Sequence, residues 1–187
     1  LTALKNGGRI SPAIAAIGNT IGLKPVISLV DGELVKTAMT TVVKKAFADK
    51  KDISVVVGHD CRNNSRFFAE IVAGIFSANG IRAFLFESLR PTPEISFAIR
   101  QLGCQSGVNI TASHNPKEYN GYKAYFEDGG QLPPDVADKV QEYIAKIDIF
   151  SVNTESENKP VMIGKETDEA YYENVLAQRQ NSDLDKK

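Results

Sequence analysis

The sequence predicts an α/β domain of three layers, in which a mixed, mostly parallel sheet carries helices on both faces. Two observations lead to this prediction. Strand-like and helix-like segments alternate over residues 53–111, which is typical of parallel strands joined by right-handed helical crossovers. The connection from residues 106–111 to the next strand, residues 122–127, is short. It suits antiparallel pairing better than a crossover, so the sheet should be mixed.

The first segments predict a helix, a strand and a second helix. Ser11-Pro12 provides a cap and a proline at the first helical position, and Gly22 suits the end of that helix. Residues 26–30 are interpreted as a strand. The second helix covers residues 35–47, because its apolar residues share one helical face: Val35, Met39, Val42, Val43, Ala46 and Phe47.

The central segments follow the α/β alternation closely. Strands are predicted at residues 53–57, 81–87 and 106–111. The first intervening helix should be capped by Asn63, Asn64 or Ser65 and should stop at Asn79-Gly80. The second should open with Thr92 as cap and Pro93, and should close at Gly103.

The C-terminal part begins with the strand at residues 122–127 and a turn at Asp128-Gly129-Gly130. A helix is then introduced by Pro133-Pro134. Its apolar side comprises Val136, Val140, Tyr143, Ile144 and Ile147. Residues 151–159 are almost free of apolar side chains and are interpreted as a linker.

The composition excludes several classes of function. The 187 residues are 42% hydrophobic and 24% charged, as in an ordinary globular protein. A formal net charge of -1 gives no broad attraction to nucleic acid or to an anionic membrane. No apolar run is long enough to span a bilayer. Two isolated cysteines without a C-x-x-C motif suit a reducing cytoplasm, which is the predicted location.

The residues that best predict chemistry are Thr111-Ala112-Ser113-His114-Asn115-Pro116. They end a strand with small polar residues and a proline, which places the Ser113 hydroxyl at the open end of a sheet. A hydroxyl is a weak nucleophile and needs a neighbouring base or cation. His114, Lys117 and Lys123 are the candidates within reach. From the residues alone, Ser113 could also be an ordinary turn serine and Lys123 an exposed strand lysine.

This string, T-A-S-H-N-P, is followed by K-E-Y-N-G-Y-K. The pair resembles the active-site serine loop of the α-D-phosphohexomutases, the phosphoglucomutase/phosphomannomutase enzymes. In that family the serine is carried as a phosphoserine, which phosphorylates a sugar monophosphate and takes a phosphoryl group back from the bisphosphate. The resemblance implies that Ser113 is the phosphoryl carrier and that His114 and Lys123 are also catalytic. It further implies that Thr111, Asn115, Lys117 and Asn120 support the substrate and the phosphate loop.

A second string, Gly58-His59-Asp60-Cys61-Arg62, also resembles the mutases, in which the aspartate and arginine support the serine loop. The alternative is an Asp60–Arg62 pair that only fixes a loop, and the two readings are compatible. His59 is expected to be structural. The resemblance also implies Mg²⁺, bound to Ser113 through its phosphate. The family supplies the other ligands from a D-G-D-x-D-R loop, and no such string occurs here.

The resemblance divides the chain into three parts. Residues 35–150 match the first mutase domain, and residues 151–187 resemble a linker and the start of a truncated second domain. Residues 1–34, which contain L-K-N-G-G-R-I-S, separately resemble a segment of the DegV-type fatty-acid-binding proteins. They would form an appendage, as in a chimera. The G-T-A/G-G-L-R-G strand expected of a mutase at this position is absent.

The predicted function is therefore that of a phosphoserine-carrying domain of a sugar-phosphate mutase. Such an enzyme moves a phosphoryl group between the 1- and 6-positions of a hexose through a bisphosphate. The expected partners are hexose phosphate and hexose bisphosphate, and neither nucleic acid nor a membrane. The remaining mutase domains are missing, so this chain alone is expected to be inactive. The alternative is a non-catalytic fatty-acid or phosphate-binding module, or an artificial fusion without activity.

Overall fold

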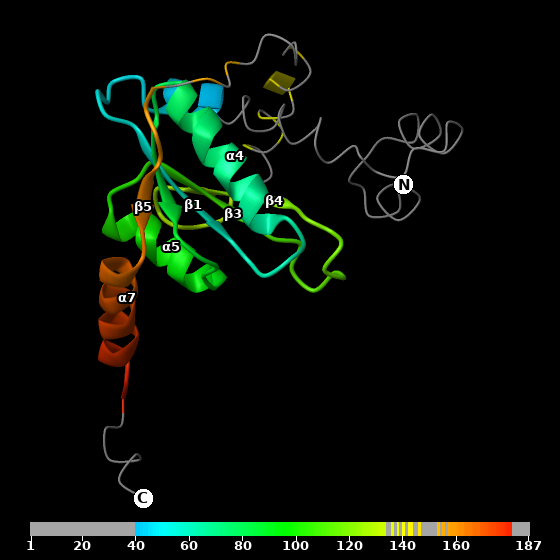
Figure 1. Cartoon of the computed structure of the whole chain (residues 1–187). Coiled ribbons are helices and arrows are strands. Elements are labelled where there is room, and N and C mark those ends of the chain that lie inside the picture. The colour runs from blue at the N-terminus through cyan, green and yellow to red at the C-terminus, as the bar shows by residue number, and fades with distance from the viewer. Residues whose placement is uncertain are drawn as a thin grey trace, which may run out of the picture.

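A computed structural model of the protein describes residues 40–133, 136, 138, 140, 142, 143, 146, 153, 155 and 157–180. Within these residues five strands form one sheet in the order β4-β3-β1-β2-β5 (Figure 1). Four of the strands are parallel, and β4 runs antiparallel to β3. The mixed, mostly parallel sheet predicted from the sequence is thus confirmed. The strands are β1 (Ser54–His59), β2 (Arg82–Phe86), β3 (Ser106–Ile110), β4 (Tyr122–Phe126) and β5 (Val161–Ile163).

The two long central helices cover opposite faces of this sheet. Helix α4 (Ser65–Ala78) packs with Val55 and Val57 of β1 in one apolar cluster. Helix α5 (Thr92–Gln101) packs with Val56 in a second cluster. Alternate residues of β1 therefore face different layers, and all three are fully buried. A helical segment at residues 40–46 also contributes to the α4 side through its buried valines.

Two glycines let α5 approach the sheet closely. A Cβ atom at Gly107 would lie 2.3 Å from Cδ1 of Ile99, and one at Gly58 would lie 2.5 Å from Cδ1 of Ile95. Both isoleucines are fully buried. These two strand positions must therefore lack a side chain for this packing to form.

The helix ends show where local prediction succeeds and fails. Both predicted stops are confirmed, with left-handed backbone at Gly80 and Gly103. Asn64, one of the three residues predicted to cap the first of these helices, is the N-cap of α4, in a left-handed conformation and without a side-chain capping hydrogen bond. The cap predicted at Thr92 is wrong. Thr92 is the first residue of α5 rather than its cap, because its hydroxyl accepts a hydrogen bond from the buried Asn109 amide at 3.0 Å.

The segments after β3 follow the prediction as far as they are described. The antiparallel β3–β4 pair is confirmed, and the turn at residues 128–130 closes with the Gly129 N–H donating to the Phe126 carbonyl at 2.9 Å. Val136 and Val140 belong to helical positions that pack against the α4-side cluster. Ile144 and Ile147, and every element predicted within residues 1–39, lie outside the described residues.

The chain continues into a short strand and a last helix. Strand β5 pairs in parallel with β2 at the edge of the sheet, and α7 (Lys165–Ala177) follows it, extending away from the sheet in Figure 1. The rings of Tyr171 in α7 and Phe97 in α5 lie 5.6 Å apart. The division of the chain at residue 150 stays a prediction. None of the described helices is long and apolar enough to cross a membrane.

Candidate functional site

The serine loop lies at the carboxyl end of β3, an interior strand of the sheet. The neighbouring strand β1 is parallel to β3, and its last residue pairs with Ile110. Asp60 and Arg62 therefore emerge beside the serine loop, although about fifty positions separate the two segments in the sequence. In open α/β sheets this carboxyl edge is where ligands bind.

Ser113 is exposed and sits in a left-handed backbone conformation, with φ of 59°. This conformation is unfavourable for a residue with a side chain, by about 1–2 kcal/mol, so its surroundings must hold it. The Ser113 N–H donates to the Thr111 hydroxyl at 3.0 Å. The Ser113 hydroxyl lies 3.5 Å from Nδ1 of His114, which is also exposed.

Asp60 anchors the loop through its carboxylate. Oδ2 accepts hydrogen bonds from the Thr111 hydroxyl at 2.6 Å and from Arg62 Nε at 2.9 Å. Oδ1 accepts the Arg62 backbone N–H at 3.0 Å and lies 2.9 Å from the Ser65 hydroxyl. Burial alone would raise the pKa of this carboxyl, but the hydrogen bonds outweigh it and hold the pKa below its usual value.

The Arg62 side chain holds the serine loop through hydrogen bonds to main-chain carbonyls of the loop. Its guanidinium donates to Asn115 and Pro116 at 2.7 Å each, to Tyr119 at 3.3 Å, and also to Ser113. The side chain is only 7% exposed and pairs with Asp60. The Asp60–Arg62 pair proposed from the sequence is thus confirmed, and its geometry joins the two loops.

The other predicted support residues occupy different places around this loop. The Asn115 amide donates to the Ala112 carbonyl at 3.0 Å and closes the turn. The Asn120 amide donates to the Asn63 carbonyl at 2.6 Å. Lys117 is exposed, and among the described residues only its carbonyl is hydrogen-bonded, by the Asn63 N–H at 3.1 Å.

A cavity of about 590 Å³ opens at the loop and includes both Ser113 and Lys123 in its wall. Lys123 projects from β4, directly opposite Asn109 of β3. Lys123 is partly exposed and forms no ion pair within the described part of the chain. Its ammonium group is therefore available to a ligand. The cavity also takes in His114, Asn115 and Asn120.

The side chains around this cavity do not fit Mg²⁺ by themselves. They offer hydroxyl, amide, imidazole and ammonium groups but no carboxylate, whereas Mg²⁺ is usually held by carboxylates and phosphate oxygens. The nearby Asp60 carboxylate is already engaged by three neighbouring residues. No cluster of metal-binding side chains occurs among the described residues.

Sequence reasoning missed the part that Ser65 plays. The sequence predicts for Ser65 only a possible helix cap, but its hydroxyl lies 2.9 Å from Asp60 Oδ1 and 2.8 Å from Asn120 Oδ1. Having one proton, it donates to one of these oxygens at a time. Ser65 and Asn120 are 55 positions apart in the sequence, so no local pattern could reveal this contact.

His59 is buried beside the loop, in keeping with the structural role expected for it. Its Nδ1 lies 2.9 Å from the Asp60 carbonyl, and its Nε2 has no hydrogen-bond partner within the described residues. The residue as a whole is 5% exposed. It cannot reach a ligand in the serine cavity without rearrangement.

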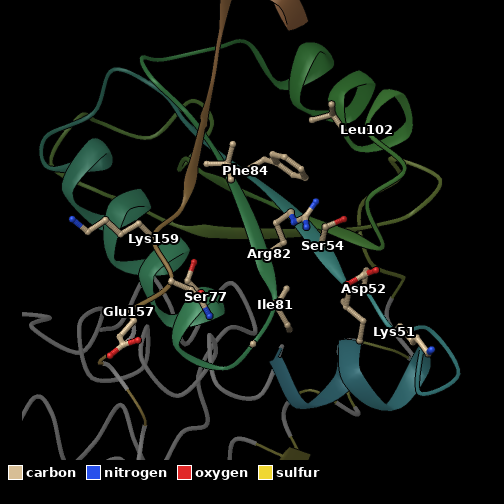
Figure 2. A pocket seen from close by; sticks show the side chains of 14 residues that line it. Lys51, Asp52, Ser54, Ser77, Ile81, Arg82, Phe84, Leu102, Glu157 and Lys159 are labelled. Carbon is tan, nitrogen blue, oxygen red and sulfur yellow. The ribbon is translucent and has the colours of Figure 1, made fainter.

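A second cavity, of about 510 Å³, lies at the opposite edge of the sheet, where β1 and β2 begin. Figure 2 shows Arg82 near its middle beside Ser54, while the charged ends of Lys51, Glu157 and Lys159 lie apart at its periphery. These groups do not converge on a common point, so the arrangement does not resemble a reactive centre.

Comparisons with known proteins point to one family. A family model described as phosphoglucomutase/phosphomannomutase, alpha/beta/alpha domain I, matches residues 19–150. The match begins inside residues 1–34, and the DegV resemblance of that segment is unconfirmed. A phosphoglucomutase from Staphylococcus epidermidis is 38% identical over 167 residues, which cover 83% of this chain and 30% of the relative. A phosphoglucomutase from Staphylococcus haemolyticus is 45% identical over 97 residues, covering 51% of this chain and 18% of the relative.

Solved structures share the fold. A crystal structure from Thermus thermophilus, assigned as a phosphomannomutase, superposes with a TM-score of 0.67 at 27% identity, covering 78% of this chain and 31% of that chain. The Paramecium phosphoglucomutase pp63/parafusin gives a TM-score of 0.61 at 22% identity, with 84% and 32% covered, and supports the fold alone. The chain spans less than a third of the length of these relatives. From the family match and the extent of identity, the chain belongs to the phosphoglucomutase/phosphomannomutase family, whose α/β/α domain I it contains.

Proposed function

We propose that this chain is the phosphoserine-carrying domain of a sugar-phosphate mutase and that Ser113 carries the phosphoryl group. The observation that supports this best is the position of the Ser113 hydroxyl. It is exposed in the same cavity as the Lys123 ammonium group, on a left-handed turn that Arg62 and Thr111 hold in place. A serine hydroxyl that shares a cavity with a lysine ammonium group suits phosphoryl transfer, because the positive charge offsets the charge of the phosphate.

The proposed reaction is a pair of phosphoryl transfers. In the first, the bond between phosphorus and the Ser113 oxygen breaks and a bond from phosphorus to a sugar hydroxyl oxygen forms. The hydroxyl proton passes to a base, and the leaving serine oxygen keeps the electron pair. The second transfer, from the other end of the bisphosphate, restores the phosphoserine.

Lys123 is proposed to act at the sugar hydroxyl, either as the group that exchanges the proton or as a positive charge near the transferred phosphate. His114 lies 3.5 Å from the Ser113 oxygen, so it could orient the loop or assist the proton transfer. Asp60 and Arg62 would act as positioning residues, since they bond the loop and do not line the cavity. Asn115 closes the turn of the loop and also lines the cavity.

The substrates proposed from the resemblance are hexose phosphate and hexose bisphosphate, in the cytoplasm. Mg²⁺ is expected on the phosphate of Ser113, with carboxylates from elsewhere, because the cavity itself offers none. No step is assigned to the ion. With the chain spanning less than a third of its relatives, we expect poor or no mutase turnover by this chain alone.

The direct test is phosphorylation of Ser113. The chain is incubated with glucose 1,6-bisphosphate, and intact-mass analysis followed by peptide mapping should find one added phosphate on Ser113. Ser113→Ala should take up none. Phosphate located elsewhere, or none at all on the unaltered chain, would contradict the proposal. A coupled assay with glucose 1-phosphate should show little turnover. No observation in the described residues favours the fatty-acid-binding alternative.

A further inference from the structure

A cluster of ionisable side chains joins helix α7 to the rest of the domain, away from the serine loop. Arg90 follows β2, Glu94 lies in the first turn of α5, and Asp168 lies in the first turn of α7. Apart from this cluster, α7 has few attachments. Thr167 is its one buried residue, and Tyr171 contacts the Phe97 ring. The charged cluster is therefore a large part of what holds α7.

Arg90 and Asp168 form a two-pronged ion pair, with Nε to Oδ1 at 2.7 Å and Nη2 to Oδ2 at 2.7 Å. Their side chains are 13% and 20% exposed. Such planar, paired contacts are strong and strongly orienting. The Arg90 N–H also donates to the His59 carbonyl at 3.2 Å, which fixes the arginine to the end of β1.

Glu94 makes this cluster unusual, because three carboxylates surround one guanidinium. The Glu94 side chain is only 2% exposed and lies 3.6 Å from Arg90 Nε. Glu87, which is 60% exposed, lies 3.7 Å from Arg90 Nη2. Burial, then a hydrogen bond with Asp168 and the negative charge of Asp168, raises the pKa of Glu94 to about 7. Glu94 is buried, its Oε1 has no hydrogen-bond partner within the described residues, and the partly exposed Asp168 takes the same arginine. A carboxyl group in this position keeps its proton beside the ionised Asp168.

We propose that a single proton shared between Glu94 and Asp168 controls the docking of α7, so that α7 is held more tightly in mildly acidic than in mildly alkaline solution. Protonated Glu94 donates a hydrogen bond to Asp168, which stays ionised because Arg90 lowers its pKa. When Glu94 loses its proton, two negative carboxylates from α5 and α7 face each other and the hydrogen bond disappears.

The sign of the pH dependence of α7 docking follows from the linkage between docking and proton binding. The pKa of Glu94 is about 7 in the docked state against 4.5 for an ordinary glutamate. The docked state therefore binds the proton more tightly, and the stabilisation is complete below the ordinary pKa and is lost as the pH rises to 7. Between pH 6 and pH 8 the docking constant should fall by up to about tenfold, since each pKa unit corresponds to a factor of ten.

Hydrogen exchange measured by mass spectrometry tests this on the whole chain. After correction for the intrinsic rates, the opening equilibrium of amides in α7 should increase by up to about tenfold from pH 6 to pH 8, while that of α4 stays constant. In Glu94→Gln the side chain can donate to Asp168 but cannot ionise, so the pH dependence of α7 should disappear. Glu87→Gln, at the exposed carboxylate of the same cluster, should keep it.

Equal pH dependence in the unaltered chain and in Glu94→Gln would overturn the proposal, as would parallel changes in α4 and α7. If Glu94→Gln disturbs the whole fold, the pKa of Glu94 in the unaltered chain is measured instead, from the pH dependence of its carboxyl ¹³C NMR shift. A titration near pH 7 supports the proposal, and one below pH 5 refutes it. The test is independent of the phosphoserine assignment.

Discussion

Replacing Arg62 by alanine is the perturbation from which we expect the largest effect on the serine loop. The guanidinium donates to the main-chain carbonyls of four loop residues and to the Asp60 carboxylate, and its side chain is 7% exposed. Arg62→Ala removes all of these bonds at once. The Asp60 carboxylate then keeps the Thr111 and Ser65 hydroxyls and the backbone N–H of residue 62 as partners.

The magnitude follows from these contacts. A hydrogen bond to a charged group contributes about 1.5–3 kcal/mol, and bonds that share one donor group are not additive. Water can replace some of the bonds to the exposed carbonyls. We therefore expect a loss of about 3 kcal/mol in the free energy of unfolding, near the lower end of what breaking a buried pair costs. A displaced Ser113 should also be phosphorylated about 10²-fold more slowly.

Urea unfolding gives the stability, and time-resolved intact-mass analysis with glucose 1,6-bisphosphate gives the phosphorylation rate. Arg66→Ala is the matched control. Arg66 lies four residues later, in the first turn of α4. Its side chain is 57% exposed and bonds one carbonyl and Glu70, so its loss should cost less than about 1 kcal/mol. If Arg62→Ala and Arg66→Ala have equal stability and equal phosphorylation rates, the loop is not held in the way argued here.

Three further predictions test the site and the packing. Lys123→Met should leave the urea midpoint nearly unchanged and should lower phosphoryl transfer from Ser113 to a sugar phosphate by about 10²-fold, which single-turnover mass analysis would measure. Asp60→Asn should make the stability of the protein depend less on pH in acid. Because the pKa of Asp60 is lower in the folded protein than its ordinary 3.8, the ionised carboxylate stabilises the fold above pH 3.8, and this stabilisation is lost as the pH falls through the folded pKa. Urea midpoints measured between pH 6 and pH 2 should therefore fall less steeply in the variant. Gly107→Ala should cost about 1–3 kcal/mol, because its Cβ would lie 2.3 Å from the buried Ile99 side chain. Gly74→Ala in α4, with nothing within 4 Å of the new Cβ, should be neutral or stabilising by up to about 1 kcal/mol; equal effects of the two glycine changes would contradict the packing argument.

The sequence alone was enough to predict that the sheet is mixed and mostly parallel and that Ser113 follows one of its strands. The alternation of Val108 and Ile110 with polar residues in β3, and the short apolar run Val55-Val56-Val57 in β1, both indicate strands because they are local properties of the sequence. The short connection between β3 and β4 likewise limits that pair to an antiparallel arrangement. The string from Thr111 to Pro116 is local too, so its position after a strand could be read without any knowledge of distant contacts.

Tertiary structure decided which polar side chains meet. Thr111 reaches Asp60 across 51 positions, and Arg90 reaches Asp168 across 78. Such contacts depend on which strand ends and helix ends come together, and no local period encodes that. The same reason explains the failed cap at Thr92. Its hydroxyl could bond its own backbone or a distant partner, and only the folded sheet supplies the buried Asn109 amide that it accepts from.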